Sequence, residues 1–83
     1  MPTATLTIAS TWTSAATGAT NVLIPAIDRG FRWAITTGSA PAMSPDVCPF
    51  VKAGDQLSLQ LAAGETLYVT AFPALSTTVT TGA

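Results

Sequence analysis

The sequence predicts an all-β protein: a small antiparallel β-sandwich or barrel with an extended N-terminal segment and almost no helix. Apolar residues alternate with polar ones in several short runs, which is the period of a half-buried strand. Turn signals rich in Gly, Pro, Asn and Asp separate these runs at intervals of about 8–12 residues. No window of helical length combines an amphipathic stripe with capping residues.

Residues 56–72 carry the clearest alternation. Leucines at every second position are followed, after Ala62-Ala63-Gly64, by a second alternating run. We expect a β-hairpin in which Gly64 supplies the left-handed position of a three-residue loop. This register sets Leu59 opposite Leu67, and both apolar rows then share one face of the sheet.

The first 21 residues predict a strand or an extended arm followed by a loop, and residues 22–83 predict the sandwich core. Thr alternates with Ala, Leu and Ile up to position 8, and the run carries no charge that would prevent pairing at a sheet edge. We expect residues 2–10 to act as an assembly arm, with Leu6 and Ile8 filling shallow pockets on a partner. The alternative is that the same residues are an integral strand of the sandwich.

The middle of the chain predicts further strands. Residues 11–21 favour a loop or a loosely paired segment, anchored by Trp12. The apolar run 22–27 favours a strand at a sheet edge, or one with a break at Pro25. Apolar and polar residues alternate along residues 31–37, and this pattern predicts a strand whose inward residues are Phe31, Trp33 and Ile35.

Proline and glycine shape the connections in the second half. Three prolines between positions 39 and 49 exclude a helix or a central strand, so we expect a long loop there. Residues 52–55 predict a turn. The Thr-rich tail after Pro73 predicts one more strand or a frayed end.

The composition indicates a chain that associates. Its 83 residues make one domain with a thin core. Charged residues are 8% of the chain, whereas about 25% is typical of soluble domains, and the net charge is −1. Weak self-repulsion and apolar surface favour association, so we expect a homo-oligomer, a trimer or a dimer. The alternative is a small soluble domain that is simply rich in Ala and Thr.

Several partner classes are not expected. Three basic residues, Arg29, Arg32 and Lys52, cannot supply the many phosphate contacts that nucleic-acid binding needs. No apolar run approaches the roughly 18 residues of a membrane span, so we expect no membrane partner. Cys48 is the single cysteine, and we read it as a buried small hydrophobe.

The residues predict no enzyme. The chain has no histidine, so neither a Ser-His pair nor an imidazole metal ligand can form. The four acids lie at predicted turns, where carboxylates commonly cap or form the turn. There is no Gly-rich phosphate cradle and no metal-ligand cluster, and Cys48 lacks a nearby base. We therefore expect no catalytic residue, no cofactor and no metal.

Residues 33–36 (Trp-Ala-Ile-Thr), 52–55 (Lys-Ala-Gly-Asp) and the hairpin phrase at 59–69 resemble small β proteins encoded among the virion genes of tailed bacteriophages. Such proteins include capsid-decorating and other small structural components. The resemblance covers about half of the chain. It implies a structural protein, often a trimer or dimer seated on a larger shell, and it transfers no catalytic residues.

Two hypotheses about function follow. The first is a virion structural protein, assembled in the host cytoplasm, that decorates or cements the capsid through self-association and contacts with the major capsid protein. The second is a small carbohydrate- or peptide-binding β module, associated with a tail or fibre, with Trp12, Trp33 and Tyr68 as stacking platforms. For Trp33 core packing is the favoured role. The candidate interface residues are Leu6, Ile8, Trp12, Tyr68 and Phe72.

Overall fold

The computed structural model describes residues 3–27, 29–37, 39, 41, 48–71 and 74–82. Within these residues the regular secondary structure consists of strands, and no helix is present. The strands are β1 (Thr3–Ile8), β2 (Thr13–Thr17), β3 (Thr20–Pro25), β4 (Phe31–Thr37), β5 (Phe50–Val51), β6 (Gln56–Leu61), β7 (Glu65–Thr70) and β8 (Leu75–Gly82). The all-β class expected from the sequence is confirmed.

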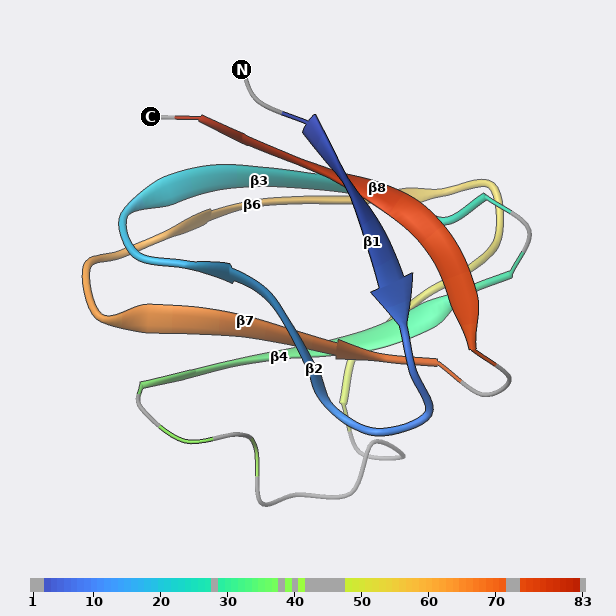
Figure 1. Cartoon of the computed structure of the whole chain (residues 1–83), viewed down its shortest axis with the longest axis horizontal. Coiled ribbons are helices and arrows are strands. Elements are labelled where there is room, and N and C mark those ends of the chain that lie inside the picture. The colour runs from blue at the N-terminus through green and yellow to red at the C-terminus, as the bar shows by residue number, and fades with distance from the viewer. Residues whose placement is uncertain are drawn as a thin grey trace.

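The strands form two four-stranded sheets (Figure 1). Sheet A has the strand order β1-β8-β3-β6, and sheet B has the order β2-β7-β4-β5. All the registered pairs are antiparallel. Figure 1 shows β3, β6 and β8 on one side of the molecule and β4 and β7 on the other. The fold is therefore the small sandwich expected from the sequence, and not a closed barrel.

The pairing follows one simple rule along the whole chain. β1 pairs with β8, β2 with β7, β3 with β6 and β4 with β5. The residue numbers of two partners add up to nearly the same value throughout, from Thr3 with Thr80 to Phe31 with Val51. The chain is thus one long antiparallel ribbon that doubles back once, with its tip between β4 and β5.

This ribbon is wrapped so that successive segments alternate between the sheets. Among the eight strands only β4 and β5 follow one another within the same sheet, and each of the other connections crosses from one sheet to the other. Pairing between β8 and β3 and between β7 and β4 completes the sheets. Two four-stranded sheets wound in this order from eight strands form a jelly roll.

The predicted hairpin at residues 56–72 is wrong in its pairing. β6 pairs with β3 in sheet A, whereas β7 pairs with β2 and β4 in sheet B. The turn itself is as expected: Gly64 has a φ of 85°, and the Glu65 N–H donates to the Ala62 carbonyl oxygen at 3.2 Å. The apolar rows meet across the sandwich instead of side by side, and alternation alone is satisfied by either arrangement.

The N-terminal residues are built into both sheets. β1 is an edge strand of sheet A and pairs with β8 over its whole length. The segment expected to be a loop contains β2, which pairs with β7 through a bulge between Ser14 and Ala16. The link from β1 to β2 is tied down at Ala9, whose carbonyl oxygen accepts hydrogen bonds from the Ala71 N–H and the Thr70 hydroxyl. The structure therefore has an integral strand where an arm was the leading expectation.

The remaining strands follow the predicted runs, with one difference in β3. β4 lies at residues 31–37 as predicted. β3 lies between β8 and β6 and is not an edge strand, but it does end at Pro25, whose carbonyl oxygen accepts a hydrogen bond from the Thr77 hydroxyl at 2.6 Å. The Thr-rich tail forms β8, between β1 and β3. Most of the predicted proline-rich loop lies outside the described residues.

The core lies between the two sheets and draws on both. Its largest fully buried side chains are Ile8, Val22, Ile24, Phe31, Leu61, Leu67 and Val69. Trp33, Ile35 and Leu59 are partly buried and pack against this cluster. Cys48 is buried, as expected for a small hydrophobe. Since every side chain in this core comes from a strand or its immediate end, the sheets cannot separate without exposing it.

Candidate functional site

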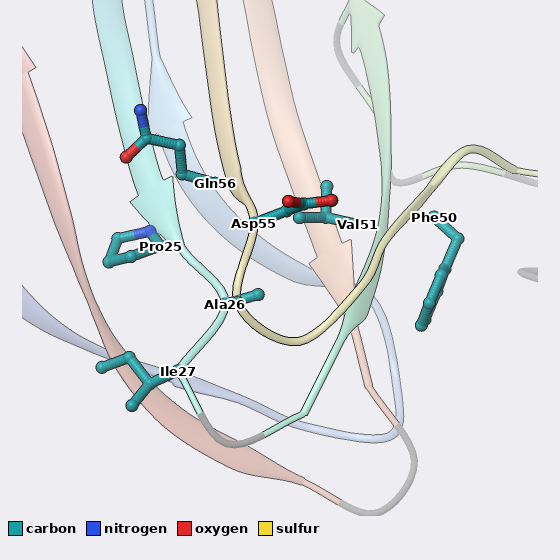
Figure 2. A pocket seen from close by; sticks show the side chains of 8 residues that line it. Pro25, Ala26, Ile27, Phe50, Val51, Asp55 and Gln56 are labelled. Carbon is teal, nitrogen blue, oxygen red and sulfur yellow. The ribbon is translucent and has the colours of Figure 1, made fainter.

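Among the described residues two large apolar side chains stand out as exposed, and both lie on one groove. Ile27 is 56% exposed and Phe50 is 55% exposed. Both line a groove of about 620 Å³, together with Pro25, Ala26, Val51, Gly54, Asp55 and Gln56. Figure 2 shows Ile27 and Phe50 at its two ends, with Ala26, Val51 and Asp55 between them. The groove lies beside the short strand β5 and the start of β6.

The Phe50 ring is held in place although it faces solvent. β5 sets Phe50 opposite Arg32 of β4, and the Arg32 guanidinium carbon lies 5.1 Å from the ring centroid. The same guanidinium donates a hydrogen bond from Nη1 to the Cys48 carbonyl oxygen at 3.0 Å. A Cβ on Gly30 would overlap both the Phe50 ring and the Val51 carbonyl oxygen, so the ring lies directly against this glycine. An exposed aromatic side chain with this support loses little freedom on binding.

The floor of the groove is made rigid by main-chain hydrogen bonds. The Ala26 N–H donates to the Asp55 carbonyl oxygen at 2.9 Å, and the Gly54 N–H donates to the Ala26 carbonyl oxygen at 2.8 Å. The Asp55 N–H closes the turn on the Lys52 carbonyl oxygen at 3.0 Å. Gly54 has a φ of 92°, a conformation that glycine adopts without strain. The predicted turn at 52–55 is confirmed, and it joins β5 firmly to the end of β3.

The groove offers apolar contact and a few hydrogen bonds. Its polar side chains are those of Asp55 and Gln56, both exposed. Outside the groove, the Glu65 carboxylate accepts a hydrogen bond from the Ala62 N–H at 2.6 Å and so caps the turn after β6. Among the described residues no group of three His, Cys, Asp or Glu side chains could hold a metal ion.

The structure does not bring the predicted interface residues together at this groove. Leu6 is 8% exposed and Ile8 is 0% exposed, and both belong to the core cluster. This corrects their expected role, because side chains that fill the chain's own core cannot also fill pockets on a partner. Trp12 and Tyr68 are partly buried elsewhere. Phe72 lies outside the described residues.

Ile27 and Phe50 were missed, although the sequence holds a signal for both. Each is adjacent to another apolar residue that is buried, Ala26 in one case and Val51 in the other. Side chains of neighbouring residues in an extended chain point to opposite faces. One member of each adjacent apolar pair must therefore face outward, and the pairs Ala26-Ile27 and Phe50-Val51 predict an exposed hydrophobic side chain at that point.

The strand edges form a second feature of the surface. In sheet B, β2 is interrupted by a bulge and β5 is two residues long, and both devices discourage pairing with another chain. In sheet A, β1 and β6 are each six residues long, in unbroken register, and without a charge or a proline. Only sheet A therefore leaves long edges without a protecting device.

Sheet A also differs in its charge. The sequences of its four strands contain no charged residue at all. Its outer side alternates with the buried rows and carries mainly Thr, Ser, Asn and Gln, and the hydroxyls of Thr3 and Thr80 lie 2.9 Å apart across β1 and β8. In sheet B, by contrast, Arg32 and Glu65 lie within strands. Sheet A is therefore a face rich in hydroxyl and amide groups. A partner that covers it does not have to bury a charged side chain of its strands.

A smaller cavity of about 380 Å³ opens between the sheets at the end where β1 begins. Its lining consists of Thr3, Ala4, Ala15, Ala16, Thr17, Thr20, Val79 and Thr81. These side chains are small. Unlike the lining of the groove at Phe50, which includes Asp55, this lining contains no charged group.

Comparison with protein-family models, with curated proteins and with solved structures finds no match. The described residues include no helix that is both long and apolar enough to cross a membrane.

Proposed function

We propose that this chain is a non-enzymatic structural protein of a tailed-phage particle. It decorates or cements the capsid through self-association and through contacts with the major capsid protein. Its place of action is the virion, with assembly in the host cytoplasm. The resemblance of residues 33–36, 52–55 and 59–69 to small virion proteins supports the phage context of the proposal.

The observation that carries the proposal is the charge-free sheet A of a jelly roll. The jelly roll is a fold of viral capsid domains and of lectins. The fold is therefore compatible with a capsid role, but it does not by itself determine the function. The centres of protein interfaces are depleted of charged residues, and sheet A has none in any of its four strands. A face of this kind suits permanent contact with a shell better than exposure to water as a free monomer.

Sheet A is the surface that we assign to the capsid under this proposal. Its outer hydroxyl and amide groups can exchange hydrogen bonds with polar groups of a partner without the cost of desolvating a charge. Sheet B, which carries Arg32 and Glu65, would face outward or toward the solvent. The particle then holds the chain through one sheet and presents the other.

The test is quantitative mass spectrometry of purified particles that carry this gene. The chain should be present in many copies per particle. Thr78→Lys, which places a charge on the outer side of β8, should reduce the copy number, whereas Ser14→Lys on the exposed side of β2 should leave it unchanged. Absence of the chain from the particles, or equal loss with both variants, would contradict the proposal.

A second candidate function is a carbohydrate- or peptide-binding module. One observation favours it: the exposed ring of Phe50 lies on the same groove as Asp55 and Gln56. An aromatic platform beside carboxylate and amide groups is suited to stacking on a sugar while hydrogen-bonding its hydroxyls. Of the aromatic residues expected to serve as platforms, Trp33 packs against the core, and Trp12 and Tyr68 are partly buried.

The two functions are separated by one variant. Phe50→Ala should abolish saccharide binding on a glycan array if the chain is a binding module, and it should leave the copy number in particles unchanged if sheet A is the attachment surface. A binding module should also be a stable monomer in solution.

A further inference from the structure

The two long edges of sheet A are not equivalent in what they leave uncovered. On β1 the inward-facing Leu6 and Ile8 are already buried by the chain itself, and the third inward-facing residue, the small Ala4, is exposed. On β6 the inward-facing Leu57 and Leu61 are buried, but Leu59 between them is only partly buried. β5 is the corresponding edge strand of sheet B. Its two residues pair with Phe31 and Arg32, so it is too short to offer a long edge to an added strand. A strand added beside β6 would therefore cover part of a leucine side chain, whereas a strand added beside β1 would cover only the methyl group of Ala4.

The exposed hydrophobic side chains lie on the same margin of the molecule as β6. Gln56, the first residue of β6, lines the groove that carries Ile27 and Phe50. Pro25, which precedes Ala26 and Ile27, pairs directly with Gln56. The groove therefore lies at the beginning of β6 (Figure 2). Exposed apolar side chains close to an edge strand with free main-chain groups are typical of an association surface.

The sequence of β6 is complementary to itself. Residues 56–60 read Gln-Leu-Ser-Leu-Gln, the same in both directions about Ser58. In an antiparallel pair centred on Ser58, Gln56 of one copy faces Gln60 of the other and Leu57 faces Leu59. The leucines then lie on the core side and the amides on the outer side of both copies, and no charges face one another. A twofold axis requires this kind of self-complementary patch.

We propose that two copies of this chain associate by antiparallel pairing of their β6 edges about Ser58. The pairing joins the two copies of sheet A into one continuous eight-stranded sheet, and it covers Leu59 of each copy with Leu57 of the other. In the same register Ala62 of one copy faces Gly54 of the other, so the turn after β6 enters the groove between Ile27 and Phe50. The main-chain hydrogen bonds contribute affinity, and the leucines and the groove contribute specificity.

The dimer is a specific form of the self-association that the proposed function includes. The inference rests on the proposed function only for this self-association. The dimer also uses a different surface from the one that we assign to the capsid. The β6 edge and its groove lie at the margin of sheet A, whereas the outer hydroxyl side of sheet A lies at right angles to this margin and stays free. One dimer can therefore present a doubled, charge-free sheet to a larger shell.

The experiment compares two lysine variants by sedimentation velocity and light scattering of the purified full chain. Ser58→Lys places like charges opposite one another at the twofold axis, and such a juxtaposition opposes association. Thr5→Lys is the matched control, because Thr5 is also exposed, uncharged and central in a long edge strand of sheet A. The expected results are a dimer for the wild type and for Thr5→Lys, and at least a tenfold weaker dimer for Ser58→Lys.

A second measurement separates charge repulsion from a general loss of fold. Ser58→Asp should also be weakened alone, and an equimolar mixture of Ser58→Lys and Ser58→Asp should restore a dimer of mixed composition. A merely structural defect would not be rescued by mixing. Circular dichroism confirms that each variant remains folded.

Two outcomes overturn the inference. These are a wild-type monomer at the highest soluble concentration and a dimer that survives Ser58→Lys, and in the second case loss of the dimer in Thr5→Lys would assign the contact to β1. Failure of the proposed function looks different, since a chain that dimerises through β6 but is absent from purified particles would retain the dimer and lose the virion role.

Discussion

β6 and β7 are neighbours in sequence and close to equal in length and pattern, yet they occupy opposite kinds of position. Each has six residues and alternates apolar with polar side chains, and three residues separate them. β6 is an edge strand with one neighbour, β3. β7 lies inside sheet B between β2 and β4. Figure 1 shows the chain crossing from one sheet to the other between them.

Their outer residues differ accordingly. Gln56, Ser58 and Gln60 alternate with the leucines of β6 and are exposed. Thr66 and Thr70 hold the same alternating places in β7, yet they are buried. Thr66 lies between Thr17 of β2 and Thr36 of β4, whereas Thr70 pairs with Arg32 of β4 and is covered on its other side by the link at Ala9. The comparison teaches that alternation determines which way a side chain faces, whereas the position of the strand in its sheet determines how much surface it loses.

The largest expected effect is the formation of an engineered disulfide, which either forms or does not and so tests the pairing of β3 with β6. Asn21 and Gln60 are directly paired across β3 and β6, where Cα atoms lie about 4.5–5.5 Å apart, within the range a disulfide spans. Cysteines at these two positions in a Cys48→Ser background should form a disulfide quantitatively under mild oxidation. Loss of free thiol and a shift on non-reducing electrophoresis after proteolysis are the measurements.

The matched control places cysteines at Gln60 and Thr66. A hairpin between β6 and β7 would make these residues direct partners, but the sandwich puts them on the outer sides of different sheets. No disulfide should form within one chain. The opposite pattern, a bond between 60 and 66 but none between 21 and 60, would restore the hairpin.

Much of the fold was predictable because alternation, turn chemistry and composition are local signals. The strand at residues 31–37, the left-handed Gly64 and the turn at 52–55 all follow from neighbouring residues. Strand pairing was not predictable in the same way, because the partners lie far apart in sequence, as Thr3 and Thr80 do. The hairpin prediction failed at this point, since pairing the nearest two apolar rows buries them no better than stacking them across a sandwich.

The candidate site was less predictable than the fold. Leu6 and Ile8 were assigned to a partner because the N-terminal run is short and uncharged, but the β8 tail that covers them is more than 65 residues away in the sequence. Ile27 and Phe50 lie at strand ends, where adjacent apolar residues show that one faces outward without showing which one. The groove itself depends on the contact between the end of β3 and the turn before β6.

The next effect compares cavity formation in the two strands. Leu67 is 0% exposed in β7, and Leu67→Ala should lower the free energy of unfolding by about 2–5 kcal/mol because the cavity it leaves is enclosed. Leu59 lies in an edge strand and is only partly buried, so Leu59→Ala should lower the free energy of unfolding by about 1–2 kcal/mol. Urea denaturation at one protein concentration measures both. Equal costs would show that β6 is as enclosed as β7.

A smaller effect concerns the turn that sends the chain from β6 to β7. Gly64 has a φ of 85°, and a Cβ there would meet no atom within 4 Å. Gly64→Ala should therefore cost about 1–2 kcal/mol from backbone strain alone. Gly64→Asn is the control and should cost less, because asparagine tolerates the left-handed region. A thermal midpoint that falls equally with both variants would point to a steric cause instead.

The smallest effect tests the outer residues of the two strands. The Thr70 hydroxyl is buried and donates to the Ala9 carbonyl oxygen at 3.2 Å, which ties the end of β7 to the link between β1 and β2. Thr70→Val keeps the shape of the side chain and removes the donor, so it should lower the free energy of unfolding by about 0.5–1.5 kcal/mol. The Ala9 oxygen retains the Ala71 N–H at 3.0 Å, and this second donor keeps the loss at the lower end of that range. Ser58→Ala in β6 is the matched change on an exposed outer position, and it should stay within about 0.5 kcal/mol of the wild type. A larger loss for Ser58→Ala than for Thr70→Val would mean that the outer side of β6 is more covered than the outer side of β7, against the exposure of Ser58 in the structure.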